Sequence, residues 1–265
     1  MYNKTKEIEP VVAEKEKEEE NIGNEEKTAE NQTFFSHLEE LRKVLIVCIA
    51  SIFVGFVVTF AFFSEAILNF ITAPLTEHNV AVVYIGLAEV FTTQLRVSFI
   101  GGVLLASPIL FWKVWSFLKP ALFPKEKRMF SSVFFVMIFL FVAGVTFAYF
   151  LVFNIVINFF LITGEGIATP MISMERFLGL LLSFVIPFGL IFQTPVVIIL
   201  LHKLGIITIV GLKKIRKYVI FGIVVLSALV TPPDIISLFM MAVPGIALYE
   251  IGIIFAKLNE LRKPA

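Results

Sequence analysis

The sequence predicts an all-α, polytopic membrane protein with six transmembrane helices, of which helices 5 and 6 are short, and with both termini in the cytoplasm. Composition is the first reason, because 58% of the 265 residues are hydrophobic and 16% are charged, against roughly 25% charged in a soluble domain. The mean hydropathy of +0.92 points the same way. In addition, the apolar residues gather in long stretches free of charge, and Lys and Arg concentrate in alternate connections between them.

The first 33 residues differ from the rest of the chain. They carry 10 acidic and 5 basic side chains, a net charge of −5, and few residues that a core could bury. We therefore predict a disordered acidic N-terminal tail at 1–33, followed by a six-span membrane domain at 34–260 and a C-terminal tail at 261–265. The tail lacks the layout of a signal peptide, so we expect the first span to stay in the mature protein.

Six charge-poor stretches predict the spans, since a helix needs about 20 apolar residues to cross about 30 Å of hydrocarbon. They are residues 44–63, 97–118, 129–153, 177–201, 218–230 and 235–256. The fifth has 13 residues, about 20 Å of helix, and Glu250 interrupts the sixth after 15 residues. We expect both to be short for the bilayer, which must then thin locally.

Prolines mark the expected turns and bends. Residues 231–234 (T-P-P-D) predict a tight turn between the last two spans, because paired prolines cannot continue a helix and Asp234 is a good N-cap. Pro108, Pro187 and Pro195 lie within spans and are expected to kink them, although membrane helices also tolerate proline. Pro74 is expected to mark a further turn or kink.

The positions of Lys and Arg predict the orientation. Basic residues flank the first span, fill the second and fourth connections and end the chain, whereas the other three connections contain only Arg96 and Arg176. The basic side faces the cytoplasm, so six spans place both termini there.

Enzyme signatures are absent from the sequence. There is no G-x-x-x-x-G-K-[ST], H-E-x-x-H or G-x-S-x-G motif, and the three histidines lie on different segments. The single Cys48 excludes an intramolecular disulfide and is read as a packing residue. We expect no enzyme, no cofactor, no metal site and no nucleic-acid partner.

Two segments on the predicted cytoplasmic side could bind a ligand. Residues 34–43 place apolar side chains at helical spacing, with Glu40 and Arg42 pointing to different sides. Residues 115–128 are aromatic, bracketed by prolines and then basic, with Glu126 as the only acid, and they predict a short loop. An interfacial anchor and an aromatic belt also explain these two patterns.

Two polar residues lie inside the predicted spans. Gln193 is four residues, about 6 Å, from the middle of the fourth span, where an amide needs a partner. That partner is either a neighbouring helix or a polar surface met by another protein. Glu250 is expected to lie near the cytoplasmic boundary or to pair with a neighbour.

Seven short motifs occur in order between residues 34 and 260. They are F-S-H-L-E-E-L-R at 35–42, A-P-L at 73–75, S-P at 107–108, V-W-S-F through P-A-L at 114–122, F-A-Y-F at 147–150, T-P-P-D at 231–234 and Y-E-I-G at 249–252. Each motif is weak alone, but as an ordered set they resemble the TatC family, the multi-span subunits of the twin-arginine protein translocase.

The resemblance implies a receptor in a bacterial cytoplasmic (inner) membrane that binds the twin-arginine signal peptides of folded cargo, exported with the proton motive force. It also implies small single-span partners of the TatA and TatB type, contact with membrane lipid, and assembly of several copies. By position, Glu40 and Glu126 would receive the signal's two arginines, while Arg42, Phe117 and Pro120 would shape the surface. Paired carboxylates suit two guanidiniums, because such hydrogen bonds are charge-assisted.

Gln193 departs from the family pattern, since many members carry Glu at this position. A glutamine keeps the capacity for hydrogen bonds but cannot ionise, so a proton-coupled role cannot operate at this residue. Two other functions remain open on the residues alone. A secondary transporter of a small solute would explain the kinked helices, although no internal repeat is evident, and a scaffold without a ligand would tolerate changes of cytosolic charge.

Overall fold

The computed structural model describes residues 39–77, 80–122, 127–164, 166 and 170–261. The chain forms two compact units, Met1–Val47 and Cys48–Ala265, and each is considered by itself. The predicted tail at 1–33 and the last four residues lie outside the described residues. In the first unit the described chain is helical from Glu39 onward.

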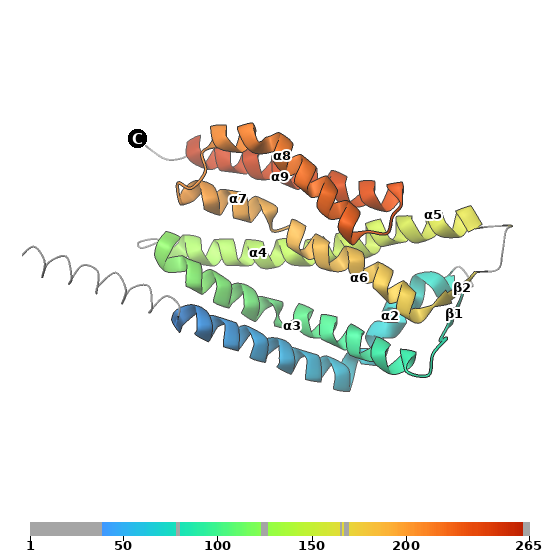
Figure 1. The fold of residues 1–265 in the computed structure, drawn as a ribbon. Coiled ribbons are helices and arrows are strands. Elements are labelled where there is room, and N and C mark those ends of the chain that lie inside the picture. Colours follow the sequence, from blue (N-terminus) through green and yellow to red (C-terminus); the bar gives the residue numbers. More distant parts are fainter. Residues whose placement is uncertain (1–38, 78–79, 123–126, 165, 167–169, 262–265) are drawn as a thin grey trace, which may run out of the picture. The chain divides into compact units, whose positions relative to one another are not determined.

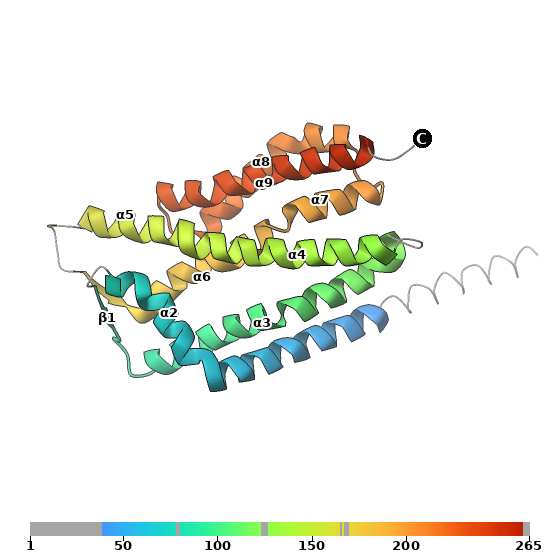
Figure 2. The ribbon, with the colours of Figure 1, turned by 180° about the vertical axis from the view of Figure 1, so that it is seen from behind.

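The first predicted span is part of a longer helix that changes geometry at its end. The helix over residues 39–58 passes into a wide π-helical turn, η1 (Thr59–Phe63), and then into α2 (Ser64–Glu77). Within η1, the buried Thr59 hydroxyl donates to the Gly55 carbonyl at 2.8 Å, a bond that competes with the backbone ladder and favours a bend. Figure 2 shows α2 turned away from the helix before it. Pro74 lies inside α2, near its end.

The second and third spans also belong to longer helices. Helix α3 (Glu89–Leu122) contains Pro108 and exceeds the predicted span at both ends. Helix α4 (Lys127–Phe147), the π-helical turn η2 (Ala148–Phe153) and α5 (Asn154–Gly164) follow without a break, as Figure 2 shows. The predictions were too short because they counted charge-free residues, whereas a helix continues through polar residues when nothing interrupts its hydrogen bonds.

The fourth span is divided into two helices. Helix α6 (Met174–Ile191), which contains Pro187, ends at Phe192, and α7 (Thr194–Lys203) begins after Gln193. Pro195 stands in the first turn of α7, where its missing N–H has no consequence for the new helix. The break therefore falls at residues 192–193, and it leaves Gln193 between two helices.

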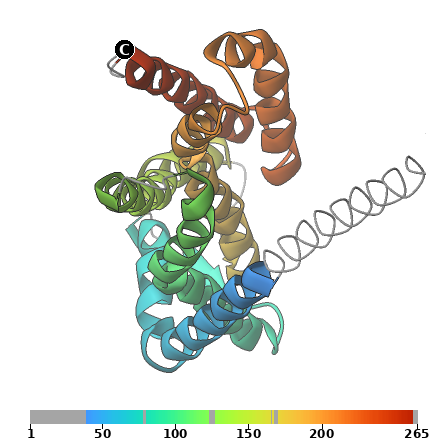
Figure 3. The ribbon, with the colours of Figure 1, turned by 90° about the vertical axis from the view of Figure 1, so that its left-hand side faces the viewer.

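The last two helices, α8 (Ile209–Val230) and α9 (Ile235–Leu261), form an antiparallel pair, seen obliquely in orange and red in Figure 3. In the turn between them the Asp234 carboxylate accepts a 2.6 Å hydrogen bond from the backbone N–H of Ser237, the geometry of an N-cap. Helix α9 does not end at Glu250. Both helices are longer than their predicted spans. Only their charge-free segments are therefore short relative to the thickness of the bilayer.

Five helices in the described part of the chain are long and apolar enough to cross a membrane. They are the helices over Glu39–Thr76, Glu89–Phe117, Ser132–Gly164, Met174–Lys203 and Ile235–Leu258. Helix α8 has the length, but its first half carries four cations, at residues 213, 214, 216 and 217. Helix α8 contains the fifth predicted span, 218–230, which is therefore the one that composition leaves out.

A small sheet departs from the all-α prediction. Strands β1 (Ala81–Val83) and β2 (Met171–Ser173) pair in parallel, with Ala81 opposite Met171. Strands of three residues are too short to show the alternation by which a strand is recognised in a sequence. The sheet joins the connection before α3 to the start of α6 (Figure 1).

The core of the second unit centres on η2 and α6. Phe153, Phe184 and Phe188 are fully buried there, together with Leu178. Large apolar side chains also face outward, such as Phe62 at 78% exposure and Phe139 at 71%. Outward aromatic and aliphatic surface of this kind is what lipid, rather than water, accommodates.

Candidate functional site

The first half of the predicted ligand surface lies in the helix that is described from Glu39 onward. Glu40 and Arg42 are both exposed, and two positions of separation turn them to different sides of that helix. Lys43 is paired with Glu39 at 2.9 Å, one helical turn away. The neighbouring apolar side chains Leu41 and Leu45 are 47% and 58% exposed. This short segment therefore presents charge and apolar surface together.

The second half belongs to the other unit. Phe117 is half-buried near the end of α3, and Pro120 lies in the last turn of that helix. This corrects the loop expected over residues 115–128, since α3 continues through Pro120 to Leu122 and α4 begins at Lys127. Glu126 lies outside the described residues. A site that joins Glu40 to Glu126 therefore stays a prediction.

Gln193 lies at the break between α6 and α7 and is 8% exposed. Its side-chain Nε2 donates a 3.1 Å hydrogen bond to the Met137 carbonyl of α4, 56 residues earlier. Its Oε1 is buried, and none of the described residues donates to it. At the break, the side-chain amide of Gln193 therefore links the interrupted helix to α4. Its carbonyl oxygen remains as a buried acceptor that no described residue uses.

Glu250 pairs with Arg216 of α8 at 2.6 Å, the second of the two placements expected from the sequence. The adjacent Tyr249 is buried, and its hydroxyl donates to the Leu212 carbonyl at 2.8 Å. Two polar links therefore hold α9 against the basic half of α8. The aliphatic surface around them is formed by Ile253 and Ile198.

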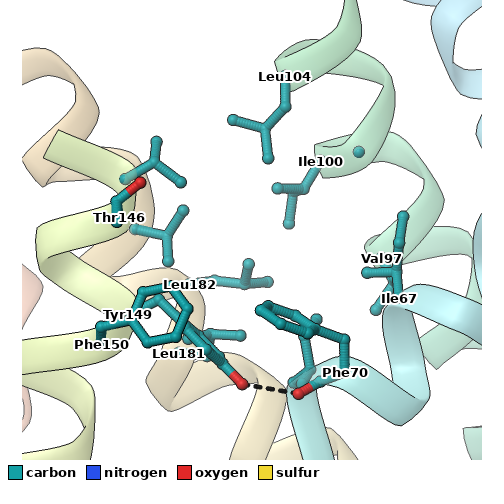
Figure 4. Close-up of a pocket in the computed structure, with 14 residues that line it drawn as sticks. Ile67, Phe70, Val97, Ile100, Leu104, Thr146, Tyr149, Phe150, Leu181 and Leu182 are labelled. Atoms are coloured by element: carbon teal, nitrogen blue, oxygen red, sulfur yellow. Dashed lines mark hydrogen bonds between the residues drawn. The ribbon is translucent and has the colours of Figure 1, made fainter. Parts of the chain in front are cut away.

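An apolar cavity of about 320 Å³ lies between α2, α3, α6 and the end of α4 (Figure 4). Ile100 and Leu104 line it from α3, and Leu181 lines it from α6. The Tyr149 hydroxyl at its edge is already engaged, because it donates to the Phe70 carbonyl at 2.6 Å. The cavity can take up hydrocarbon, but its lining offers no ionisable group for chemistry.

Glu89, the most connected polar side chain at the start of α3, is a residue that no sequence motif marks. One carboxylate oxygen accepts from the backbone N–H of Ile85 at 2.6 Å and of Gly86 at 3.1 Å. The other accepts from the Ser173 hydroxyl at 2.6 Å and from the N–H of Glu175 at 3.0 Å. Glu89 is 7% exposed. An acidic residue at the start of a helix is a sequence signal for hydrogen bonds to nearby backbone N–H groups. No sequence pattern indicates the bonds to Ser173 and Glu175, which lie more than 80 residues further along the chain.

The described residues hold no group of three or more His, Cys, Asp or Glu side chains that could bind a metal ion. Of the three histidines, His202 lies in α7, where its Nδ1 is 3.2 Å from the Ile207 carbonyl. The polar side chains of Glu89, Gln193 and Glu250 thus link separate segments of the described chain to one another.

Comparison with known proteins agrees with this arrangement. The family model for the Sec-independent protein translocase protein (TatC) matches residues 36–244. A TatC protein of Carboxydothermus hydrogenoformans is 42% identical over 226 residues, which are 85% of this chain and 93% of that protein. The TatCy protein of Bacillus subtilis is 34% identical over 226 residues, covering 85% and 89% of the two chains.

Solved structures agree as well. A crystal structure of the twin-arginine translocase receptor TatC superposes with a TM-score of 0.77 at 33% identity, covering 84% of this chain and 98% of that one. A second TatC crystal structure, in the detergent DDM, gives the same TM-score at 32% identity. These are six-helix membrane proteins, which confirms the predicted helical, polytopic membrane fold. The chain is a multi-pass membrane protein and belongs to the TatC family.

Proposed function

We propose that this protein is the twin-arginine signal-peptide receptor and a core component of the translocase that exports folded proteins across the bacterial cytoplasmic membrane with the proton motive force. One observation carries the proposal. The structural match covers 98% of the chain of a solved twin-arginine translocase receptor, with 33% sequence identity and a TM-score of 0.77. Under this proposal, the surface that binds the signal peptide is formed by side chains that this chain shares with the TatC family.

The signal's two arginines would meet Glu40 and Glu126 on the cytosolic face. Glu40 is exposed on its helix, so its carboxylate can be reached from solvent. Guanidinium and carboxylate groups form paired, charge-assisted hydrogen bonds, which a lysine cannot reproduce in the same geometry. Arg42, Phe117 and Pro120 would shape the rest of the surface, with Phe117 offering a half-buried ring.

The remaining parts of the proposal concern assembly and orientation. Cations cluster before the first span, in the second and fourth connections and at the C-terminus, which supports cytoplasmic termini. Single-span subunits of the TatA and TatB type and several copies of this chain would complete the translocase. Gln193 would contribute hydrogen bonds, because its Oε1 is buried and unused by the described residues, but it would not carry a proton.

Site-specific photo-crosslinking tests the receptor proposal. Photoreactive residues beside Glu40 and Glu126 are introduced into the full chain in native membranes, together with a twin-arginine signal peptide or its Lys-Lys variant. We expect crosslinks that disappear with the Lys-Lys peptide. Equal crosslinking of both peptides, or none, would contradict the proposal, and solute flux in liposomes of this protein alone would then indicate a transporter.

Charge reversal supplies a second test. Glu126→Arg should abolish signal binding while membrane insertion continues, because like charges then face the arginine pair. Glu260→Arg makes the same change of net charge at the end of α9 and should leave binding unchanged. Normal binding by Glu126→Arg would refute the assignment, and an equal loss in both variants would reduce the effect to general electrostatics.

A further inference from the structure

Arg176 is an exception to the charge pattern of its side of the membrane. It is the only Lys or Arg between residues 154 and 176, in a connection on the side where cations are otherwise scarce. It directly precedes the charge-free stretch that begins at residue 177. Its side chain is exposed, and among the described residues no carboxylate pairs with it. The adjacent Glu175 is instead paired with Arg96 at 2.8 Å.

An apolar slot of about 160 Å³ lies directly beside Arg176. Every other lining residue is apolar, and they come from α2, α5, β2 and α6: Leu75, Ile157, Phe160, Leu161, Ile172, Phe177 and Leu180. Leu75 and Phe177 are buried and form fixed walls, whereas Phe160 is 42% exposed at the open side. A cation therefore stands beside a hydrocarbon-lined groove, at the point where the helices enter the membrane.

The apolar walls and the neighbouring charge together limit what can occupy this slot. An apolar partner helix could cover the walls but would leave the exposed guanidinium of Arg176 without a counter-charge. A small inorganic anion could meet Arg176 but would leave the apolar walls unused. A phospholipid satisfies both features, because its phosphate complements the guanidinium and its hydrocarbon continues into the slot.

We propose that Arg176 and the slot beside it bind one phospholipid from the leaflet on the Glu89 side of the membrane. The phosphate lies against the guanidinium of Arg176, and the upper part of one acyl chain runs past Phe160 towards Leu180. Helix α6 advances 1.5 Å per residue, so Leu180 lies about 6 Å deeper than Arg176. This spacing places the headgroup contact at the interface and the chain contact below it. The proposal does not depend on the signal-peptide function.

Photolabelling of the full chain in lipid nanodiscs tests the proposal. The probe is a phosphatidylglycerol with a diazirine on one acyl chain, and labelled peptides from α5 and α6 are counted relative to the whole protein. We expect labelling to concentrate at the slot and to fall roughly tenfold in Arg176→Gln, as the loss of a charge-assisted hydrogen bond predicts. Arg176→Lys should label at an intermediate level. Lys257→Gln, with the same charge change at an exposed position of α9 outside the slot, should label like the parent protein.

A second pair of variants tests the hydrocarbon contact. Leu180→Trp fills the slot and should also abolish the local labelling, whereas Leu190→Trp, an exposed site on the same helix, should not. The diacylglycerol analogue of the probe lacks the phosphate and should not concentrate at the slot. Unchanged labelling in Arg176→Gln, or equal labelling by diacylglycerol, would overturn the proposal. Inorganic phosphate that displaces the probe as well as unlabelled phosphatidylglycerol does would show a phosphate site without lipid and would also overturn it.

Discussion

The Glu89 carboxylate accepts a 2.6 Å hydrogen bond from the Ser173 hydroxyl, 84 residues further along the chain. Ser173 ends the short strand β2, and Glu89 begins α3, so this bond joins two connections at the same end of the helices. Three backbone N–H groups complete the shell of donors around the carboxylate. The carboxylate therefore holds the two connections together through hydrogen bonds, in addition to the short sheet.

Glu89→Gln should loosen this end of the protein. The amide nitrogen of Gln cannot accept, so it would face N–H donors and leave them unpaired. We expect a lower melting temperature in detergent and faster proteolysis near residues 80–88. Glu175→Gln serves as the control, since the exposed ion pair with Arg96 is worth less than about 1 kcal/mol. Equal effects of the two substitutions would contradict this role for Glu89.

Gly102→Ala should destabilise the packing of α3 against the first span. A Cβ at Gly102 would lie 2.7 Å from the Phe56 Cα and 2.8 Å from the Gly55 carbonyl carbon, both backbone atoms that cannot rotate away. Overpacking of this kind costs about 1–3 kcal/mol, and we expect the upper end. Gly222→Ala in α8 meets open space and should be neutral or stabilising by about 0.5–1 kcal/mol. Reversible unfolding in mixed micelles measures both, and tolerance of Gly102→Ala would show that the two helices can move apart.

Tyr249→Phe should weaken the α8–α9 pair by about 1 kcal/mol, because it removes only the hydroxyl that donates to the Leu212 carbonyl. Tyr218 is 67% exposed on α8, so Tyr218→Phe should leave stability unchanged. The ring at position 218, which lies under the Lys217 ammonium at 5.0 Å, is retained in that control. Unfolding midpoints of the two variants compare the buried and the exposed hydroxyl directly. A midpoint of Tyr249→Phe equal to that of Tyr218→Phe would mean that the bond contributes nothing.

Gln193→Leu should cost about 1 kcal/mol of stability, in the range of hydrogen bonds between membrane helices, because Met137 loses its side-chain donor. Under the proposed function it should also reduce export, since the spare Oε1 acceptor disappears with the amide. Gln193→Glu keeps the acceptors and should retain more export than Gln193→Leu. Measurement of cargo export in cells carrying each variant decides this. Full export by Gln193→Leu would rule out a hydrogen-bonding role in translocation.

Much of the helical framework could be predicted from the sequence. All six predicted spans lie within helices, apart from residues 192–193 at the break in the fourth, because a bilayer requires long apolar stretches whatever their neighbours are. The acid at position 234 caps α9 through a bond to Ser237, three residues away, which a local pattern can reveal. Spacing placed Glu40 and Arg42 on different sides of a helix, whereas their candidate role came only from the family resemblance.

The remaining features depend on residues that are distant in the sequence. Gln193 contacts Met137, Glu89 contacts Ser173, and the apolar slot gathers side chains from four elements around Arg176. Hydropathy reports only whether a residue tolerates lipid, and it carries no information about which helix lies beside it. The sequence by itself therefore determined the helical membrane fold. Only the tertiary structure decided the helix break, the carboxylate link and the slot, because each is formed by contacts between separate helices.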